Sequence, residues 1–170
     1  MELRWLDHIL YWRYYHHLIE YADLSILQQK GSSLSNPSIE RIFPALTWRI
    51  RQLAMYPEKE ITDMELAEDW DGMHFGLYYE HELTAVVSLF ISGTTAQFRK
   101  MAVLPSDQRK GFGFQLLSYV INYCKEQGIQ LLWCNARVDA VEFYKKFGFI
   151  NIGEPYLRNQ IAYIKMELTF

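Results

Sequence analysis

The chain has 170 residues, of which 50% are apolar and 22% are charged, so it can bury the core of one full domain. A formal net charge of −3 argues against a general nucleic-acid binder, which needs a basic field. Cys124 and Cys134 both fall in predicted core elements, and no metal-ligand spacing occurs. We therefore expect free thiols in a reducing cytosol, hence a cytoplasmic protein, and no metal site.

Residues 1–36 differ from the rest of the chain and are predicted to form a helical N-terminal extension to a domain at residues 37–170. Apolar and aromatic side chains recur through residues 3–29 at helical spacing, and charged residues interrupt every apolar run. The segment is therefore neither a signal peptide nor a membrane span. It is either a helix packed on the core, or on a second copy of the chain in a homodimer, or a regulatory arm that binds a partner.

The domain begins with a predicted strand at residues 39–43 and a predicted helix at residues 45–55. The helix is expected to bury the apolar side formed by Leu46, Ile50 and Leu53. An acidic run follows at residues 58–71, with seven acidic residues and one lysine. This run is either a solvated face or an acidic rim that attracts an amine.

Three apolar runs after the acidic segment predict an antiparallel meander with short turns between the strands. The strands are expected at residues 73–79, 83–91 and 96–104. The middle run is apolar almost throughout, which predicts a strand at the centre of the sheet. Pro105 ends the third strand, because proline cannot donate to a sheet ladder. Two further strands are predicted near the C-terminus, separated by a loop, at residues 149–152 and 161–168.

The stretch from Gln108 to Gly113 joins the meander to a predicted helix. The first-turn amides of a helix lack intrahelical partners, and the helix dipole adds partial positive charge at the same end. Glycines let a phosphate approach the backbone, and Arg109 and Lys110 add full charges. The stretch therefore predicts a diphosphate site. It is neither a P-loop, whose pattern is absent, nor a dinucleotide fingerprint, because Leu116 stands where the third glycine would be.

Two sequence clusters carry a resemblance to a known family. The first is the pattern Gln-x-x-Gly-x-Gly at residues 108–113. The second is a predicted strand at residues 131–136, followed by Ala-x-x-Phe-Tyr-x-x-x-Gly-Phe at residues 140–149. Both occur in the order and at about the spacing of the GCN5-related N-acetyltransferases (the GNAT superfamily), whose acyl-CoA signature the first cluster resembles. The resemblance covers residues 73–169 well, extends less closely back to residue 39 and excludes the N-terminal extension.

The resemblance implies an α/β fold of layered α+β type, with a mixed, mostly antiparallel sheet and splayed parallel strands at its centre. These two strands are the ones that end at Leu104 and Asn135. In the family, the pantetheine arm of acyl-CoA fills the gap between them and pairs with the first strand. Residues implied to bind acetyl-CoA are Met101, Ala102, Val103, Gln108, Arg109, Lys110, Gly111, Phe112, Gly113, Phe114, Asn135 and Tyr144.

The activity implied by the resemblance is N-acetyl transfer (EC 2.3.1.-). Acetyl-CoA would give its acetyl group to a primary amine of a small molecule or peptide, which attacks directly in a ternary complex. Tyr144 matches the family's tyrosine acid for the departing thiolate, with a packing aromatic as the alternative. Asn135 either orients the cofactor arm or a water, or simply caps its strand. A second function class stays open, a non-catalytic acyl-CoA sensor or interaction module, although retention of Tyr144 and Asn135 favours the enzyme.

The base that deprotonates the amine is fixed by no motif, and water is an alternative to a side chain. The candidates are His74, Glu68, Asp69, Asp71 and Asp139. His74 is preferred among them, because it titrates near neutrality and begins a strand expected to face the cleft. Backbone amides near Val103 are expected to stabilise the developing oxyanion. The acceptor itself is not predicted, because acceptor loops set it and the signature does not report it.

Overall fold

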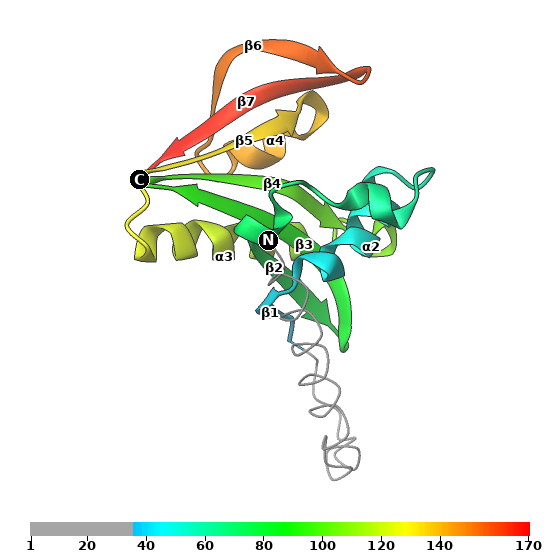
Figure 1. Ribbon diagram of the computed structural model, residues 1–170. Helices are drawn as coiled ribbons and strands as arrows, with labels where there is room; N and C mark the ends of the chain where they lie inside the picture. Colours follow the sequence, from blue (N-terminus) through cyan, green and yellow to red (C-terminus); the bar gives the residue numbers. More distant parts are fainter. Residues whose placement is uncertain (1–35) are drawn as a thin grey trace, which may run out of the picture. The chain divides into compact units, whose positions relative to one another are not determined.

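The computed structural model describes residues 36–170, which form a seven-stranded sheet with helices on both faces (Figure 1). Strand order across the sheet is β1-β2-β3-β4-β5-β7-β6, and β4–β5 is the single parallel pair within these residues. The helix predicted at residues 3–29 lies outside the described residues. In the described part of the chain, no helix combines the length and apolar character that a membrane span needs.

The first four strands confirm the predicted strand and meander, each within one residue of its expected ends. They pair antiparallel in chain order: β1 (Ser38–Ile42), β2 (Met73–Tyr79), β3 (Glu82–Ser92) and β4 (Thr95–Val103). The turn between β2 and β3 holds Glu80 and His81 at φ of 51° and 69°. Two successive positive φ values are typical of a type I′ turn, whose twist matches that of the strands it joins.

Helices cover the two faces of the sheet separately (Figure 1). One face carries α2 (Pro44–Met55), and the other carries α3 (Phe112–Glu126) and α4 (Val141–Lys145). Neighbouring β3 residues show the division, because Val86 packs with the α2 core and Val87 with the larger α3 core. Short 3-10 helices connect the elements: η2 (Ile61–Met64), η3 (Asp69–Asp71), η4 (Pro105–Asp107) and η5 (Val138–Ala140).

The buried side of α2 includes Ile50, as predicted, but neither of the two leucines. Leu46 and Leu53 are 49% and 39% exposed, whereas Ile50 and Arg51 are buried. Arg51 turns inward because its guanidinium forms a buried ion pair with Asp69, with Nη1–Oδ2 and Nη2–Oδ1 distances of 2.6 and 2.8 Å. A buried charge follows no apolar periodicity, so the pattern of leucines indicated the wrong side.

Strand β6 (Ile150–Arg158) extends beyond its predicted end at residue 152 and includes residues predicted as a loop. It pairs antiparallel with β7 (Ile161–Thr169), with an irregular register around Gly153 and Pro155. Since β6 is the edge strand of the sheet, a proline is tolerated there. The glycine and the proline therefore mark an irregularity within the strand and not its end.

Strands β4 and β5 (Leu131–Arg137) separate after three residue pairs, as the splayed fold requires. Their parallel pairing runs from Thr95–Leu131 to Gln97–Trp133. Beyond this point every β5 residue continues to pair with β7, whereas the rest of β4 stays with β3. A gap therefore opens between the two strands. On the β4 side its border is the backbone of residues 98–103, which makes no further pairs with β5.

Candidate active site

The α3 loop (residues 108–114) presents an open backbone surface at the start of its helix. Gly111 precedes the first helical turn at a φ of 89°, and a Cβ there would meet nothing within 4 Å. Space is therefore open beside the amides of residues 112–114, which have no intrahelical partners. The positive φ is what favours glycine at this position. An anionic group fits the surface, because the amides and the helix dipole both attract it.

The α3 loop packs against the end of β4. The side-chain amide of Gln108 donates a hydrogen bond of 3.2 Å to the carbonyl of Val103. A Cβ on Gly113 would lie 3.5 Å from a Val103 methyl carbon, an ordinary contact, so the helix start lies directly beside the strand. The structure thus brings together residues 101–103 and the loop, the two segments that the resemblance assigns to the cofactor.

The charged residues of the α3 loop are exposed. The Lys110 ammonium lies 2.8 Å from a carboxylate oxygen of Asp107, and this hydrogen bond raises the pKa of Lys110 and lowers that of Asp107. Arg109 has no ion pair within residues 36–170 and adopts a φ of 64°. Both cations are therefore placed at the edge of the open surface, where an anion adds attraction at little desolvation cost.

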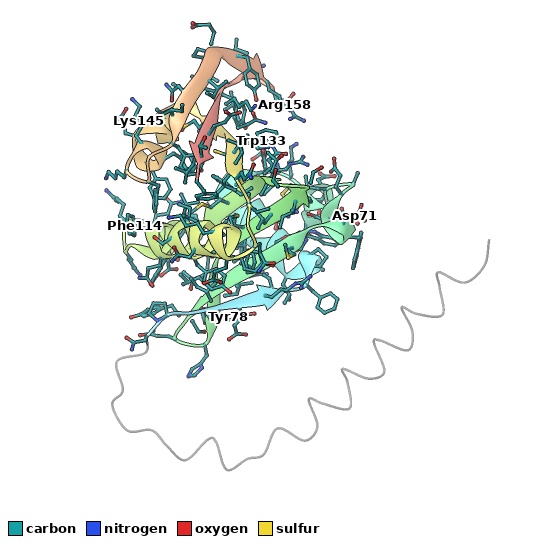
Figure 2. All side chains as sticks on the ribbon, turned by 90° about the vertical axis from the view of Figure 1, so that its left-hand side faces the viewer. Asp71, Tyr78, Phe114, Trp133, Lys145 and Arg158 are labelled. Carbon is teal, nitrogen blue, oxygen red and sulfur yellow. The ribbon has the colours of Figure 1, made fainter. Side chains whose placement is uncertain are left out.

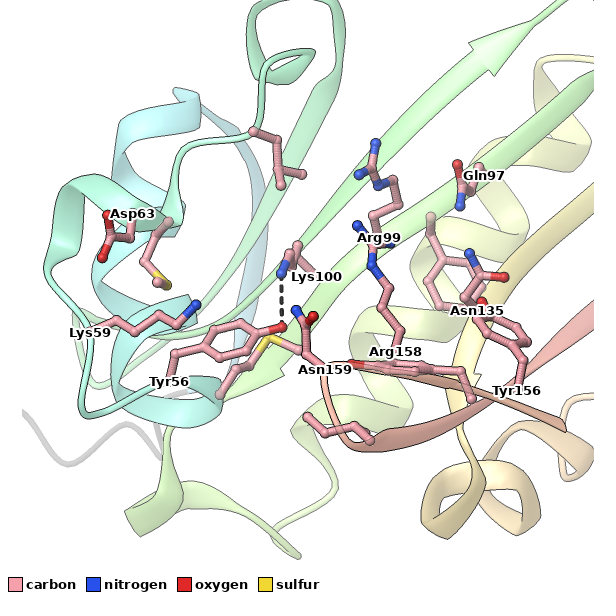
Figure 3. A pocket seen from close by; sticks show the side chains of 16 residues that line it. Tyr56, Lys59, Asp63, Gln97, Arg99, Lys100, Asn135, Tyr156, Arg158 and Asn159 are labelled. Carbon is pink, nitrogen blue, oxygen red and sulfur yellow. Dashed lines mark hydrogen bonds between the residues drawn. The ribbon is translucent and has the colours of Figure 1, made fainter.

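A cavity of about 240 Å³, the α2-side pocket, lies where β4 and β5 have separated (Figure 3). Phe98 of β4 and Asn135 of β5 both line it, and both follow the last parallel pair. Its other walls come from the end of α2 and the segment after it, and from the β6–β7 hairpin. Figure 2 shows Phe114 and Lys145 on one side of the sheet and Asp71 and Arg158 on the other. The α3 loop and the α2-side pocket therefore approach the gap from different sides.

A β-bulge in β4 directs two consecutive side chains to the α2-side pocket. The register shifts opposite β3 residues 86–88, so Lys100 and Met101 share a single β3 partner position. Lys100 has a φ of 52°, which costs free energy in a residue with a Cβ. Side chains alternate between the faces of a regular strand, but here Arg99 and Lys100 both line the pocket.

Lys100 is the most perturbed cation of the α2-side pocket. Its ammonium donates a hydrogen bond of 3.0 Å to the Tyr56 hydroxyl and lies 4.5 Å from the centre of that ring (Figure 3). Burial lowers the pKa of Lys100 from 10.5 to about 8, with further contributions from neighbouring cations. These cations are Arg51, Arg99, Arg158 and Lys59. Charge of one sign is therefore crowded at this end of the pocket.

Tyr144 lies behind the pocket wall. Its ring packs against Phe98, Phe143 and Phe149, with centroid distances of 5.7, 5.1 and 6.0 Å. Within residues 36–170 its hydroxyl has no hydrogen-bond partner. Burial raises the pKa of Tyr144 above its ordinary value, so the phenol stays protonated. Asn135 is exposed in the wall itself, and Phe98 links the two, because it lines the pocket and contacts Tyr144.

His74 does not line the α2-side pocket, although we expected it to face the cleft. It is 2% exposed, and its ring nitrogens lie 2.7 Å from the Ser88 hydroxyl and 2.7 Å from the Asp69 carbonyl. Nε2 must donate to the carbonyl, so Nδ1 accepts from Ser88, which itself accepts from Arg51. Burial lowers the pKa of His74 and keeps it neutral. The ring is thus committed to a buried network.

The carboxylates proposed as alternative bases also lie outside the pocket lining. Burial alone would raise the pKa of Asp69, but hydrogen bonds from Arg51 and the Leu66 amide lower it below the ordinary value. Glu68 and Asp71 are exposed, and Glu68 lies 3.4 Å from Arg99. Asp139 is exposed as well, 3.1 Å from Arg137. Asp63 is the one carboxylate among the lining residues.

The acidic run at residues 58–71 mostly follows the first of its two alternatives, a solvated face, with two exceptions. One member, Asp69, is a buried partner of Arg51, and one, Asp63, lines the pocket. The remaining five are exposed and line no part of it. A rim of many carboxylates around the pocket is thus absent from the described residues, and most of the run is solvated surface.

Sequence reasoning missed the cationic side of the pocket, above all Lys100 and Arg158. Lys100 was placed in a strand without any sign of a bulge, since no glycine marks one there. Arg158 falls in the predicted loop between the strands at residues 149–152 and 161–168. A lone arginine in a predicted loop is normally solvated, and only the pairing of β6 with β7 brings it to the gap.

Comparison with known proteins agrees with this geometry. Residues 51–170 match the family described as "Acetyltransferase (GNAT) domain". The uncharacterized N-acetyltransferase YitI of Bacillus subtilis (strain 168) is 28% identical over 119 residues, which make up 65% of this chain and 80% of YitI. An uncharacterized N-acetyltransferase of Bacillus thuringiensis (strain Al Hakam) is 30% identical over 116 residues, 62% of this chain and 69% of that protein.

Solved structures share the fold. The IAA acetyltransferase from Bacillus cereus ATCC 14579 superposes with a TM-score of 0.66 at 21% identity, covering 79% of this chain and 100% of that one. A GNAT family acetyltransferase from Elizabethkingia anophelis, with acetyl-CoA bound, gives 0.64 at 22% identity, covering 79% and 99%. Fold and family matches together define an acyltransferase (EC 2.3.1.-). The chain belongs to the GNAT acetyltransferase family.

Proposed function

We propose that the protein transfers an acetyl group from acetyl-CoA to a primary amine of a small molecule or peptide, by direct attack in a ternary complex. The observation that carries the proposal is the gap between β4 and β5, which the α3 loop borders from one side and the α2-side pocket from the other. Donor and acceptor can therefore occupy the site at the same time. The relative from Elizabethkingia anophelis was solved with acetyl-CoA, which supports this donor.

The chain's contribution to donor binding is mostly backbone. Amides of the α3 loop would hold the diphosphate, with Arg109 and Lys110 as exposed counter-charges. The unpaired edge of β4 at Met101–Val103 would pair with the pantetheine arm, which removes the cost of leaving those groups without partners. Acetyl-CoA supplies an activated acetyl thioester when it is bound. The open surface at Gly111 fits this assignment, since no side chain occupies it.

Two side chains and one stretch of backbone would assist the chemistry. Tyr144 is kept protonated by burial and has an unengaged hydroxyl within the described residues, so it suits the role of acid toward the departing thiolate. Asn135, in the pocket wall, would orient the cofactor arm or a water. Amides from the β4 bulge to Val103 would stabilise the developing oxyanion. The geometry gives no support to His74 as the base that deprotonates the amine. Asp63, or water that reaches the pocket, would act as the base instead.

The experiment is a screen of amine acceptors with acetyl-CoA, in which free thiol and acetylated product are both measured. We expect thiol release that depends on an amine and matches product one for one. Tyr144→Phe should reduce this signal, and Tyr119→Phe, a matched change on the exposed side of α3, should not. CoA binding without amine-dependent thiol release from any acceptor would contradict the proposal and favour the sensor alternative.

We further propose a cytoplasmic location. Cys124 and Cys134 are both free and buried, and burial raises their thiol pKa values to about 11 and about 12. Protonated, buried thiols form no disulfide framework, which fits a reducing compartment. Fractionation of cells that produce the full chain tests this location, and recovery outside the cytoplasm would contradict it.

A further inference from the structure

The α2-side pocket concentrates positive charge in a protein whose net charge is −3. Its lining includes one carboxylate, Asp63, and four cations: Lys59, Arg99, Lys100 and Arg158. The cations come from the segment after α2, from the β4 bulge and from the end of β6. The positive field is thus assembled by the fold and does not follow from overall composition.

The two arginines converge without a carboxylate between them. Figure 3 shows the Arg158 side chain extending from β6 toward Arg99 of β4. Arg158 has no ion pair within residues 36–170, and the counter-ion of Arg99, Glu68, lies outside the pocket lining. The Arg99 guanidinium also lies 5.3 Å from the centre of the Phe90 ring, another residue outside the lining. Arg158 therefore offers the guanidinium fork that suits a carboxylate or phosphate, with Arg99 beside it.

Lys100 adds an independent observation. Its ammonium is held against Tyr56 and pointed into the pocket, as the dashed line of Figure 3 marks. Burial, and after it the neighbouring cations, lower the pKa of Lys100 and make its charged form costly, and an anion that enters the pocket relieves this cost. Three tyrosines, Tyr56, Tyr156 and Tyr163, also line the pocket, and the last two stack with centroids 6.1 Å apart. They offer a surface for the carbon body of a ligand.

We propose that the acceptor is a small amine that also carries an anionic group, a carboxylate or a phosphate. The pocket binds that group between Arg158, Arg99 and Lys100, while the amine faces the gap between β4 and β5. This inference rests on the proposed transfer to an amine and names the class of acceptor. A volume of about 240 Å³ suits a small molecule, or the end of a chain, better than a folded protein surface.

The test compares two matched pairs of amines in steady-state acetylation. β-Alanine against β-alaninamide probes a carboxylate, and phosphoethanolamine against ethanolamine probes a phosphate. In at least one pair, kcat/KM for the anionic amine should exceed that of its neutral partner by about ten-fold or more. Arg158→Gln should lower this ratio by about the same factor. Arg137→Gln, the same change at an exposed arginine outside the pocket, should leave the ratio unchanged.

The inference would be overturned if kcat/KM for the neutral amine equals or exceeds that for the anionic amine in both pairs. It would also be overturned if Arg158→Gln leaves the ratio of the two kcat/KM values unchanged. A readout without turnover separates this inference from the proposed function. In CoA-saturated protein, sodium phosphate or sodium acetate should move the NMR signals of the Arg99 and Arg158 side-chain Nε–H groups saturably, and not that of Arg137. Absence of saturable movement contradicts the anion site. Saturable movement without acetylation of any amine would support the site and contradict the function.

Discussion

The α3 loop and the α2-side pocket border the same gap but are built by different means. The loop is one contiguous segment, and it offers backbone amides while its charged side chains point to solvent. The pocket gathers side chains from Tyr56 to Tyr163, on elements that meet only in the folded protein. The loop therefore depends on local backbone conformation, and the pocket depends on how the elements are packed together. Substitutions should affect the two regions accordingly.

The largest expected effect is a loss of stability when the buried ion pair between Arg51 and Asp69, on the α2 side of the sheet, is broken. Arg51→Met leaves the Asp69 carboxylate buried at 0% exposure without its partner, and removes the bond to Ser88. Breaking a buried ion pair in this way costs about 3–5 kcal/mol in the free energy of unfolding. Urea denaturation measures this loss. Lys145→Met, which removes an exposed pair with Glu142, should cost less than about 1 kcal/mol. Equal losses in the two variants would contradict the assigned role of Arg51.

The next effect concerns chemistry at the gap itself. Tyr144→Phe removes one hydroxyl and keeps the ring packed against Phe98 and Phe149, so stability should hardly change. The chemical step should slow by about 10²-fold or more, with CoA affinity little changed. A pre-steady-state measurement is required, because slow product release would hide part of the loss. If the rate of the chemical step falls by less than about three-fold, Tyr144 is a packing residue and not the acid.

A smaller effect is expected in the α3 loop, where backbone conformation decides. Gly111→Asp adds a Cβ at positive φ and a negative charge on the diphosphate surface, so calorimetry should show CoA binding weakened by about ten-fold or more. Gly128→Asp is the matched control, since Gly128 also has a positive φ, 71°, and open space around a Cβ, but lies beyond the other end of α3. Equal CoA affinities of the two variants, both folded, would show that the diphosphate does not bind at this loop.

The smallest effect tests charge crowding in the pocket. With a pKa of about 8 in the folded protein and an ordinary 10.5 when unfolded, Lys100 binds fewer protons folded than unfolded between these values. Its stability cost is therefore complete below pH 8 and disappears as the pH rises through 10.5. Lys100→Met should raise stability at pH 7 by roughly 1 kcal/mol or less, and the gain should vanish above about pH 10. A gain independent of pH would contradict the lowered pKa of Lys100, which burial and, after it, the neighbouring cations produce.

Local signals in the sequence were sufficient for much of the fold, and the donor site that we propose rests on local signals as well. The apolar runs of β2–β4 and the loop at residues 108–113 depend on neighbours in the chain, and the assignments of Asn135 and Tyr144 follow from matched motifs. The GNAT fold could thus be predicted before any coordinates, with its splayed strands. These features share one property: the residues that determine them are adjacent in sequence.

The positions of several polar side chains could not be predicted, because they depend on contacts that form only in the folded chain. Arg51 is buried because it pairs with Asp69, and no apolar pattern on α2 indicates this. His74 does not line the pocket, because its ring is hydrogen-bonded to Ser88 and to the Asp69 carbonyl. Arg158 reaches the pocket only because the edge strand β6 continues past Pro155. In each case the position of the residue in the folded chain decided its role, and no local pattern in the sequence reports that position.

NMR titration of the protein with CoA tests whether donor and acceptor approach the gap from different sides. We expect the backbone amide signals of residues 101–103 and 109–114 to move most, with saturation. Signals of Arg158 and Asn159, in the far wall of the α2-side pocket, should move little. The contrary pattern, with the largest movements at residues 158–159 and none in the α3 loop, would place CoA in the pocket and contradict the account.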